Sequence, residues 1–327
     1  MSNLKYIAQR VALMLMTLFI ITMMCFILVR MLPAVALPSE DPHTAIVEAR
    51  REALGYNKPY LVQFGIFLKN IFTEFDWGVS EVLYVGQDVY DKFLEKLPAT
   101  MIVNFLSIIL SIPIGIGLGI FAALKKNTWI DHFISTVTMI AISVPSFVYA
   151  FLIQYFLAFK LGWFPFLFGC ALDGTPLGTM SYFNPTYFWS MLPAVLALSF
   201  GVIAGFTRTT RAELTEVLTS EFMLLARTKG LTKTQATIRH AMKNCMVVVL
   251  PSIFGEFIGI LSGSLIIERI FSVPGVGQLY LNSINSRDYP MFMLLTVFYT
   301  VIGLVASIVV DVSYGFIDPR IRVGSKK

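Results

Sequence analysis

Apolar residues gather into six long runs, at about residues 9–30, 100–124, 133–159, 191–207, 245–267 and 291–312. A helix needs about 20 predominantly apolar residues to cross the hydrocarbon core of a bilayer. Because no backbone group can stay unpaired in lipid, runs of this length are expected to be helical. The pattern therefore predicts an all-α membrane protein with six transmembrane helices, of which the fourth is the shortest.

Basic residues along the loops predict how these helices are oriented. Alternate loops on one side hold Lys5, Arg10, Lys125, Lys126, seven residues between 208 and 243, Arg320, Arg322, Lys326 and Lys327. The short loops on the other side hold only Lys160, Arg269 and Arg287. Since cytosolic loops carry an excess of Lys and Arg, both termini are expected in the cytosol.

The N-terminal segment, residues 1–32, has an alternative interpretation as a cleavable signal peptide, because Ala34-Val35-Ala36 imitates a cleavage site. However, the apolar run at residues 11–29 is longer than the 7–15 residues of a signal core. We expect a retained first span.

Residues 33–97 are too polar to cross the membrane and form an outer segment. A short helix is predicted over residues 45–54, ended by Gly55. After Pro59 a second helix follows, with an apolar stripe that lies on the membrane surface or packs on the spans. The stripe consists of Leu61, Phe64, Leu68, Ile71, Phe72 and Phe75.

Composition supports lipid as the solvent. The 327 residues are 56% apolar and 14% charged, with a mean hydropathy of +0.74, whereas soluble proteins are about 25% charged. The net charge of +5 is explained by basic cytosolic loops, so nucleic acid is not expected as a partner. Three scattered cysteines, and three histidines outside the spans, give no disulfide or metal pattern.

Within the fifth span, Glu256 is the one ionisable residue, and its position is costly in lipid. It belongs either to a translocation pathway or to a carboxyl group that locks helix packing. Gly255, Gly259 and Gly263 recur at the spacing of a close helix contact. Pro145 is expected to kink the third span.

The loop at residues 208–243 is the most informative segment. Apolar residues repeat with helical period, Gly230 is placed to stop that helix, and Thr232 with Gln235 fits the capping box of a second helix that runs to about Met242. A solvated loop needs no apolar stripe, and a DNA-binding helix-turn-helix tethered to the bilayer at both ends could hardly enter a groove. Docking on a cytosolic partner explains both features. The stripe is Leu214, Val217, Leu218, Phe222 and Leu225.

Ordered motifs through nearly the whole chain resemble those of ABC importer permeases, above all the first permease subunit of dipeptide, oligopeptide and nickel uptake systems. Glu221-Phe-Met-Leu-Leu-Ala226-Arg-Thr-Lys-Gly230 is similar to their EAA loop, although Leu224 and Leu225 replace its first two letters. The other motifs are Leu97-Pro-Ala-Thr100, Pro145-Ser-Phe147, Leu161-Gly-Trp163, Leu192-Pro-Ala194, Ile238-Arg-His-Ala-Met-Lys-Asn244, Glu268-Arg-Ile-Phe-Ser-Val-Pro-Gly-Val-Gly277, Arg287-Asp-Tyr-Pro290 and Asp318-Pro-Arg-Ile-Arg322.

The resemblance implies a type I importer-like permease core at residues 98–327, in the cytoplasmic membrane of a prokaryote. It implies a second homologous permease, two ATPase subunits that bind ATP and Mg, an extracellular binding protein and a peptide substrate. The chain itself has no G-x-x-x-x-G-K-[ST] motif and is expected to be no enzyme and to hold no cofactor. The expected ATPase-coupling residues are Leu214, Leu218, Glu221, Phe222, Leu225, Ala226 and Gly230.

As a hypothesis, the helix at residues 214–229 acts as a rigid lever that moves the membrane helices between outward- and inward-open states. Two alternatives stay open at this point. One is a nickel permease, which the lack of histidine in the spans disfavours, and the other is a secondary transporter that uses Glu256 as a proton relay.

Overall fold

The computed structural model describes residues 3–33, 35, 37, 42–178 and 184–317, and these are folded mainly as helices. Five helices are long and apolar enough to cross a bilayer, and a bent pair makes a sixth candidate span. This agrees with the six predicted runs. The five are α1 (Asn3–Met31), α4 (Val89–Leu124), α7 (Pro185–Leu218), α10 (Met242–Gly259) and α13 (Tyr289–Ile317).

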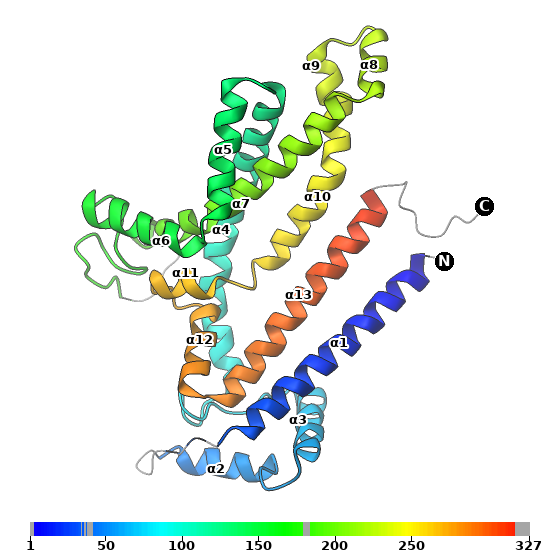
Figure 1. Cartoon of the computed structure of the whole chain (residues 1–327). Helices are drawn as coiled ribbons and strands as arrows, with labels where there is room; N and C mark the ends of the chain where they lie inside the picture. Colours follow the sequence, from blue (N-terminus) through cyan, green and yellow to red (C-terminus); the bar gives the residue numbers. More distant parts are fainter. Residues whose placement is uncertain (1–2, 34, 36, 38–41, 179–183, 318–327) are drawn as a thin grey trace.

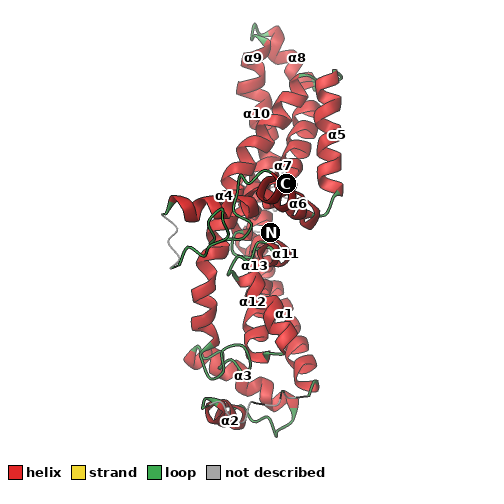
Figure 2. Cartoon of the chain, turned by 90° about the vertical axis from the view of Figure 1, so that its left-hand side faces the viewer, coloured by secondary structure: helices red, strands yellow, loops and turns green. Residues whose placement is uncertain are grey.

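The elements are arranged along one elongated bundle. Helices α8 (Glu221–Thr228) and α9 (Lys233–Ala236) lie at one end, and α2 (Thr44–Ala53) and α3 (Tyr60–Glu74) lie at the other, as Figures 1 and 2 show. Helices α1 and α13 run side by side, and Arg10 near the start of α1 pairs with Asp311 near the end of α13 at 3.1 Å. The first and last spans therefore have their terminal ends together.

The most extensive helix contact joins α4 to α7, and two glycines of α4 permit it. A Cβ on Gly115 would lie 2.7 Å from Cβ of Phe206, and one on Gly119 would lie 2.8 Å from the carbonyl oxygen of Thr207. Small residues allow helix backbones to approach closely in membranes. This glycine-rich face of α4 thus packs within the chain.

The third predicted span is broken rather than merely kinked. Helix α5 (Trp129–Ser143) and the unit formed by α6 (Ser146–Ile153) and the π-helix η1 (Gln154–Lys160) meet at an angle of 101°. Pro145 has no N–H to continue the helix, and the Tyr149 hydroxyl donates a 2.6 Å hydrogen bond to the freed carbonyl oxygen of Ala141. The kink expected at Pro145 is confirmed, but it is a 101° break between two helices rather than a bend within one helix.

The fifth span also differs from the prediction at both ends. It begins as α9, continues through the π-helix η2 (Thr237–Ala241) into α10, and ends at Gly259. There is no break between the capping-box helix and the span. Residues 265–267 lie instead in α11 (Leu265–Ile270), which is followed by α12 (Val276–Ser286). Gly263 has a positive φ of 62° and lies in the turn between α10 and α11, so it does not share a helix face with Gly255 and Gly259.

The outer segment folds as predicted at its two helices. Helix α2 has Leu54 as its C-cap and is followed by Gly55 at a φ of 67°, and α3 begins directly after Pro59. Phe64 and Phe67 of α3 pack against Phe26 of α1. Phe64, Leu68 and Ile71 of the predicted stripe therefore lie against the bundle, whereas Leu61, Phe72 and Phe75 are exposed.

The continuous helix expected at residues 214–229 is wrong. Helix α7 runs 34 residues, past the predicted end of the fourth span, and stops at Leu218, while α8 starts at Glu221. The side chains of Thr219 and Ser220 cause the break, because they bond to backbone carbonyl oxygens of the preceding turn, at 3.0 Å for Thr219 to Glu216 and 2.5 Å for Ser220 to Val217. Such local bonds compete with helix continuation.

Candidate coupling tip and polar groove

Helix α8 and the turn to α9 form a small tip at one end of the bundle, hereafter the coupling tip (residues 219–241). Helix α8 has two faces. Met223 and Ala226 are 4% and 8% exposed and pack inward, whereas Leu224 and Leu225 are 65% and 55% exposed. An eight-residue helix cannot be stable alone in water, so its inward residues must hold it to the bundle.

A cluster of apolar side chains beneath the tip supplies that support. Leu214 is fully buried on α7, and Leu218 is partly buried beside it. Met223 and Ala226 of α8 join the same cluster. Of the predicted coupling residues, Leu214, Leu218 and Ala226 therefore face the protein interior. They connect the tip to α7 rather than presenting a surface to a partner.

The remaining predicted residues are on the surface. Glu221, Phe222 and Leu225 are exposed on α8, and Gly230 is exposed in the turn that follows. Leu224 belongs to the same outward face and was not in the predicted set. The sequence-based prediction treated residues 214–229 as one helix, and in such a helix Leu224 lies off the apolar stripe. The break at Thr219 rotates the faces of α8 relative to those of α7, so Leu224 lies on the outward face.

Gly230 has the conformation that the sequence predicts. Its φ is 89°, in the region that favours glycine. Thr232 and Gln235 then form a reciprocal capping box, with the Thr232 N–H donating to the Gln235 side chain at 3.1 Å and the Gln235 N–H donating to the Thr232 hydroxyl at 3.3 Å. The direction of α9 is thus set by the positive φ of Gly230 and by the capping box that follows it.

A groove separates the tip from the turn between α4 and α5. Its cavity volume is about 490 Å³, and it is lined by Ala123, Leu124 and Lys126 on one side and by Glu221, Leu224 and Arg227 among others on the opposite side. Nearby, both carboxylate oxygens of buried Asp131 on α5 accept hydrogen bonds from Arg211 on α7, one of them at 2.9 Å. This bidentate pair fixes α5 to the part of α7 that supports the tip.

Glu256 lies in a second, separate groove deeper in the bundle. It is partly buried and lines a cavity of about 280 Å³ together with Ser252 of α10 and Gly201, Gly205 and Thr209 of α7. The structure therefore places Glu256 beside a hollow and not in a closed helix contact. It does not bring Glu256 near the coupling tip.

Two further polar centres were not recognised from the sequence. Glu268 of α11 is 2% exposed and accepts hydrogen bonds from the Thr100 hydroxyl at 2.8 Å and from the Gln278 N–H at 3.0 Å. Thr100 in turn accepts from the Val276 N–H at 2.8 Å. Burial raises the pKa of Glu268, and these hydrogen bonds oppose that shift. A Cβ on Gly277 would lie 2.9 Å from the carboxylate, which explains the glycines of that motif.

The second centre is Asp288, which precedes α13. Its buried carboxylate accepts from the Ser80 hydroxyl and from the N–H groups of Glu81, Val82 and Leu83, of which the last is at 2.9 Å. Both centres use residues from the quoted motifs, Thr100 and Glu268 in one case and Asp288 in the other. The motif at residues 318–322 lies outside the described residues.

These features define a helical membrane protein with a small tip at one end that exposes apolar side chains. Two family models match the chain: the binding-protein-dependent transport system inner membrane component at residues 115–323, and the N-terminal part of such membrane components at residues 3–104. The chain belongs to this family of transport components.

Curated relatives match over nearly the full length. The dipeptide transport system permease protein DppB of Lactococcus lactis is 34% identical over 98% of this chain and 99% of its own length. DppB of Bacillus subtilis is 31% identical, as is the oligopeptide transport system permease protein OppB of Haemophilus influenzae, with the same shares covered. The resemblance inferred from the motifs is confirmed.

Proposed function

We propose that this chain is one of two permease subunits of an ATP-driven importer in a prokaryotic cytoplasmic membrane, and that it moves dipeptides or oligopeptides inward. The observation that carries this proposal is the near full-length match to dipeptide and oligopeptide permeases, at 31–34% identity. A peptide substrate is favoured over nickel because these matched relatives are dipeptide and oligopeptide permeases. A binding protein outside the cell delivers the peptide, and two separate subunits bind ATP and Mg.

The exposed face of α8 is the proposed docking surface for an ATPase subunit. The apolar side chains of Phe222, Leu224 and Leu225 are exposed to solvent, whereas the opposite face of α8 packs on the bundle. A short helix with one exposed apolar face fits a groove on a partner protein. The groove of about 490 Å³ beside α8 is proposed as a second contact site for the same partner.

The break at Thr219 and Ser220 changes the proposed mechanism of coupling. Force on α8 reaches α7 through the apolar cluster that contains Met223, Ala226 and Leu214, not along one continuous helix. The unit that moves is the coupling tip together with the ends of α7 and α10. Because packed interfaces switch between discrete arrangements, such a unit can transmit ATPase closure to the spans.

The test is the double substitution Leu224→Ala and Leu225→Ala. Each leucine is more than half exposed, so its burial against a partner contributes about 1–2 kcal/mol. Together they account for about 2–4 kcal/mol, which weakens ATPase binding by roughly 30-fold to 1000-fold. The measurement is the affinity of the purified permease pair for the ATPase subunits, with peptide uptake in vesicles measured in parallel.

Leu61→Ala is the matched control, because Leu61 is 68% exposed but lies on α3 at the opposite end of the bundle. It is expected to bind the ATPase subunits with unchanged affinity. If the double variant also binds and transports normally, α8 is not the docking element. Uptake that survives ATP depletion but stops when the proton gradient collapses would contradict ATP coupling altogether.

A further inference from the structure

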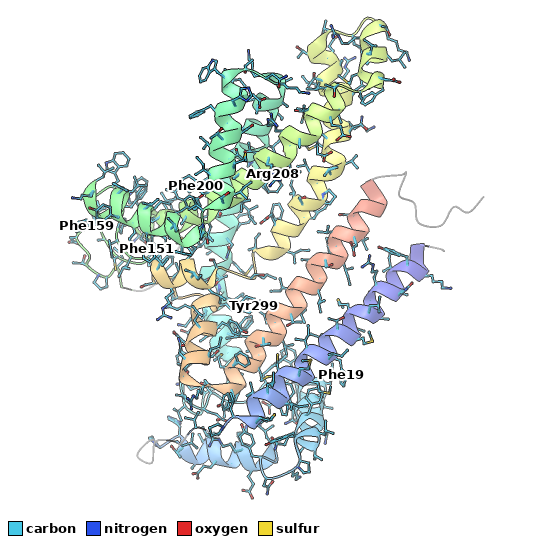
Figure 3. All side chains as sticks on the ribbon, in the orientation of Figure 1. Phe19, Phe151, Phe159, Phe200, Arg208 and Tyr299 are labelled. Atoms are coloured by element: carbon cyan, nitrogen blue, oxygen red, sulfur yellow. The ribbon has the colours of Figure 1, made fainter. Side chains whose placement is uncertain are left out.

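Two hollows meet along one face of α7. One has a cavity volume of about 560 Å³ and the other, beside Glu256, about 280 Å³. Both are lined by Gly201, Gly205 and Thr209, so they form one groove, hereafter the glycine groove. Figure 3 labels Phe200 and Arg208, which lie at the two ends of this stretch of α7. Sites for small ligands typically have volumes of about 300–1,000 Å³.

The floor of the glycine groove is bare helix backbone. A Cβ added to Gly201 or Gly205 would meet no atom within 4 Å. These glycines differ from Gly115 on α4, where an added Cβ would collide with α7. Helix packing within this chain therefore does not require glycine at positions 201 and 205, and the lack of side chains there leaves the groove open.

One wall of the groove is the break between α5 and α6. Val144 and Pro145 line the larger hollow with non-helical backbone, and Ser146, the first residue of α6, lines it as well. Non-helical backbone inside a membrane domain is tolerated where it lines a water-filled cavity. The first turn of α6 also points its N-terminal end toward this hollow, which favours an anionic group there.

The groove carries one charge of each sign. Arg208 lines the larger hollow and Glu256 the smaller, and neither has a hydrogen bond or ion pair within the part of the chain that the structure describes. Arg208 is exposed, whereas Glu256 is partly buried within a span, where an unpaired carboxylate is costly and marks a polar pathway. The other polar side chains there are uncharged, namely Ser146, Tyr149, Thr209 and Ser252.

The length of the groove along α7 suits a short chain. In the larger hollow the lining residues of α7 begin at Gly201 and include Arg208, seven residues further on, which corresponds to a rise of roughly 10 Å. An extended peptide advances about 3.3–3.6 Å per residue. The groove is therefore matched to a peptide of about two or three residues.

We infer that the glycine groove binds a short zwitterionic peptide, with its ammonium group toward Glu256 and its carboxylate toward Arg208 and the start of α6. This inference rests on the proposed function and adds the site and the groups recognised. The bare floor at Gly201 and Gly205 contacts no particular side chain of the peptide. The site thus recognises the two charged termini of the peptide and tolerates varied side chains between them.

The experiment measures binding without the binding protein. Gly205→Cys is made in the full permease pair with its ATPases. The rate at which a water-soluble maleimide labels this variant is measured, and the labelling rate of the unmodified chain is subtracted. Ala-Ala at twice its dissociation constant is expected to slow labelling about threefold. N-acetyl-Ala-Ala and Ala-Ala amide each lack one charge. At least about a tenfold higher concentration of either peptide is expected to be needed for the same protection from labelling.

Two further variants assign the ends. Glu256→Gln in the Gly205→Cys background is expected to abolish the preference for a free ammonium group, and Arg208→Gln the preference for a free carboxylate. Equal protection by all three peptides, or protection by none, overturns the inference. Loss of the second permease on purification of either variant also overturns it, because the charges then belong to the subunit interface.

Uptake separates this inference from the proposed function. Gly205→Leu is expected to reduce ATP-driven uptake of Ala-Ala about tenfold, whereas Gly117→Leu, at an equally open glycine on α4, leaves it unchanged. If the unmodified complex takes up no peptide, the proposed function fails. If it does and Gly205→Leu transports equally well, only the groove assignment fails.

Discussion

The polar centre at Thr100 allows a quantitative test of the fold. In Thr100→Val the shape is kept, but the Val276 N–H and one oxygen of Glu268 lose their partner. A buried group left without a hydrogen bond costs about 1–3 kcal/mol, and a bond to a charged acceptor contributes about 1.5–3 kcal/mol. The free energy of unfolding should therefore fall by about 3–5 kcal/mol.

Thermal unfolding of the purified permease in detergent measures this effect. For 327 residues, the usual entropy of unfolding per residue converts each kcal/mol to roughly 1.5 °C in Tm. Thr100→Val should thus lower Tm by about 5–7 °C. Thr100→Ser keeps the hydroxyl and should lower it by no more than about 2 °C. If both variants unfold at the same temperature, the hydroxyl does not satisfy these buried groups and the reasoning is refuted.

Three other substitutions give results of different size. Asp131→Asn removes the charge that Arg211 contacts on the supporting helices and should destabilise the protein by about 1–3 kcal/mol, seen as a lower Tm; an unchanged Tm would mean that this pair contributes nothing. Gly230→Ala should cost about 1–2 kcal/mol through its φ of 89°, since an added Cβ has open space, and uptake and ATPase rates should fall together; normal rates in an assembled complex would contradict a role for this turn. Asp311→Asn breaks an exposed pair and should leave Tm unchanged in physiological salt, so a clear drop would show that the pair is stronger than its exposure implies.

Features set by neighbouring residues were predictable from the sequence. The stop at Gly230, the capping box of Thr232 with Gln235, and the start of α3 after Pro59 each depend on residues a few positions apart. The bend at Pro145 was predicted as a kink, but its angle depends on how α6 packs against α7, which no local pattern records. The break at Thr219 and Ser220 was missed because an apolar stripe continued across it.

Long-range pairings were not predictable from one sequence. Thr100 and Glu268 are 168 positions apart, and Ser80 and Asp288 are 208 apart. Their residue types are common, and neither periodicity nor spacing connects them. The same limit applies to Leu214, whose place in the apolar stripe suggested a docking surface. Only its burial in the apolar cluster beneath the coupling tip shows that it faces inward.

The Asp288 carboxylate has a consequence for local opening of the protein. It joins the backbone of residues 81–83 to the first turn of α13, where it also receives the Met291 N–H at 3.5 Å. The outer loop cannot open unless that carboxylate loses its hydrogen bonds from the Ser80 hydroxyl and from the N–H groups of residues 81–83. Amide hydrogens of Leu83 and Met291 should therefore exchange with deuterium at similar rates, as members of one cooperative unit, although they are distant in sequence. The outer loop and the last span would then move as one body.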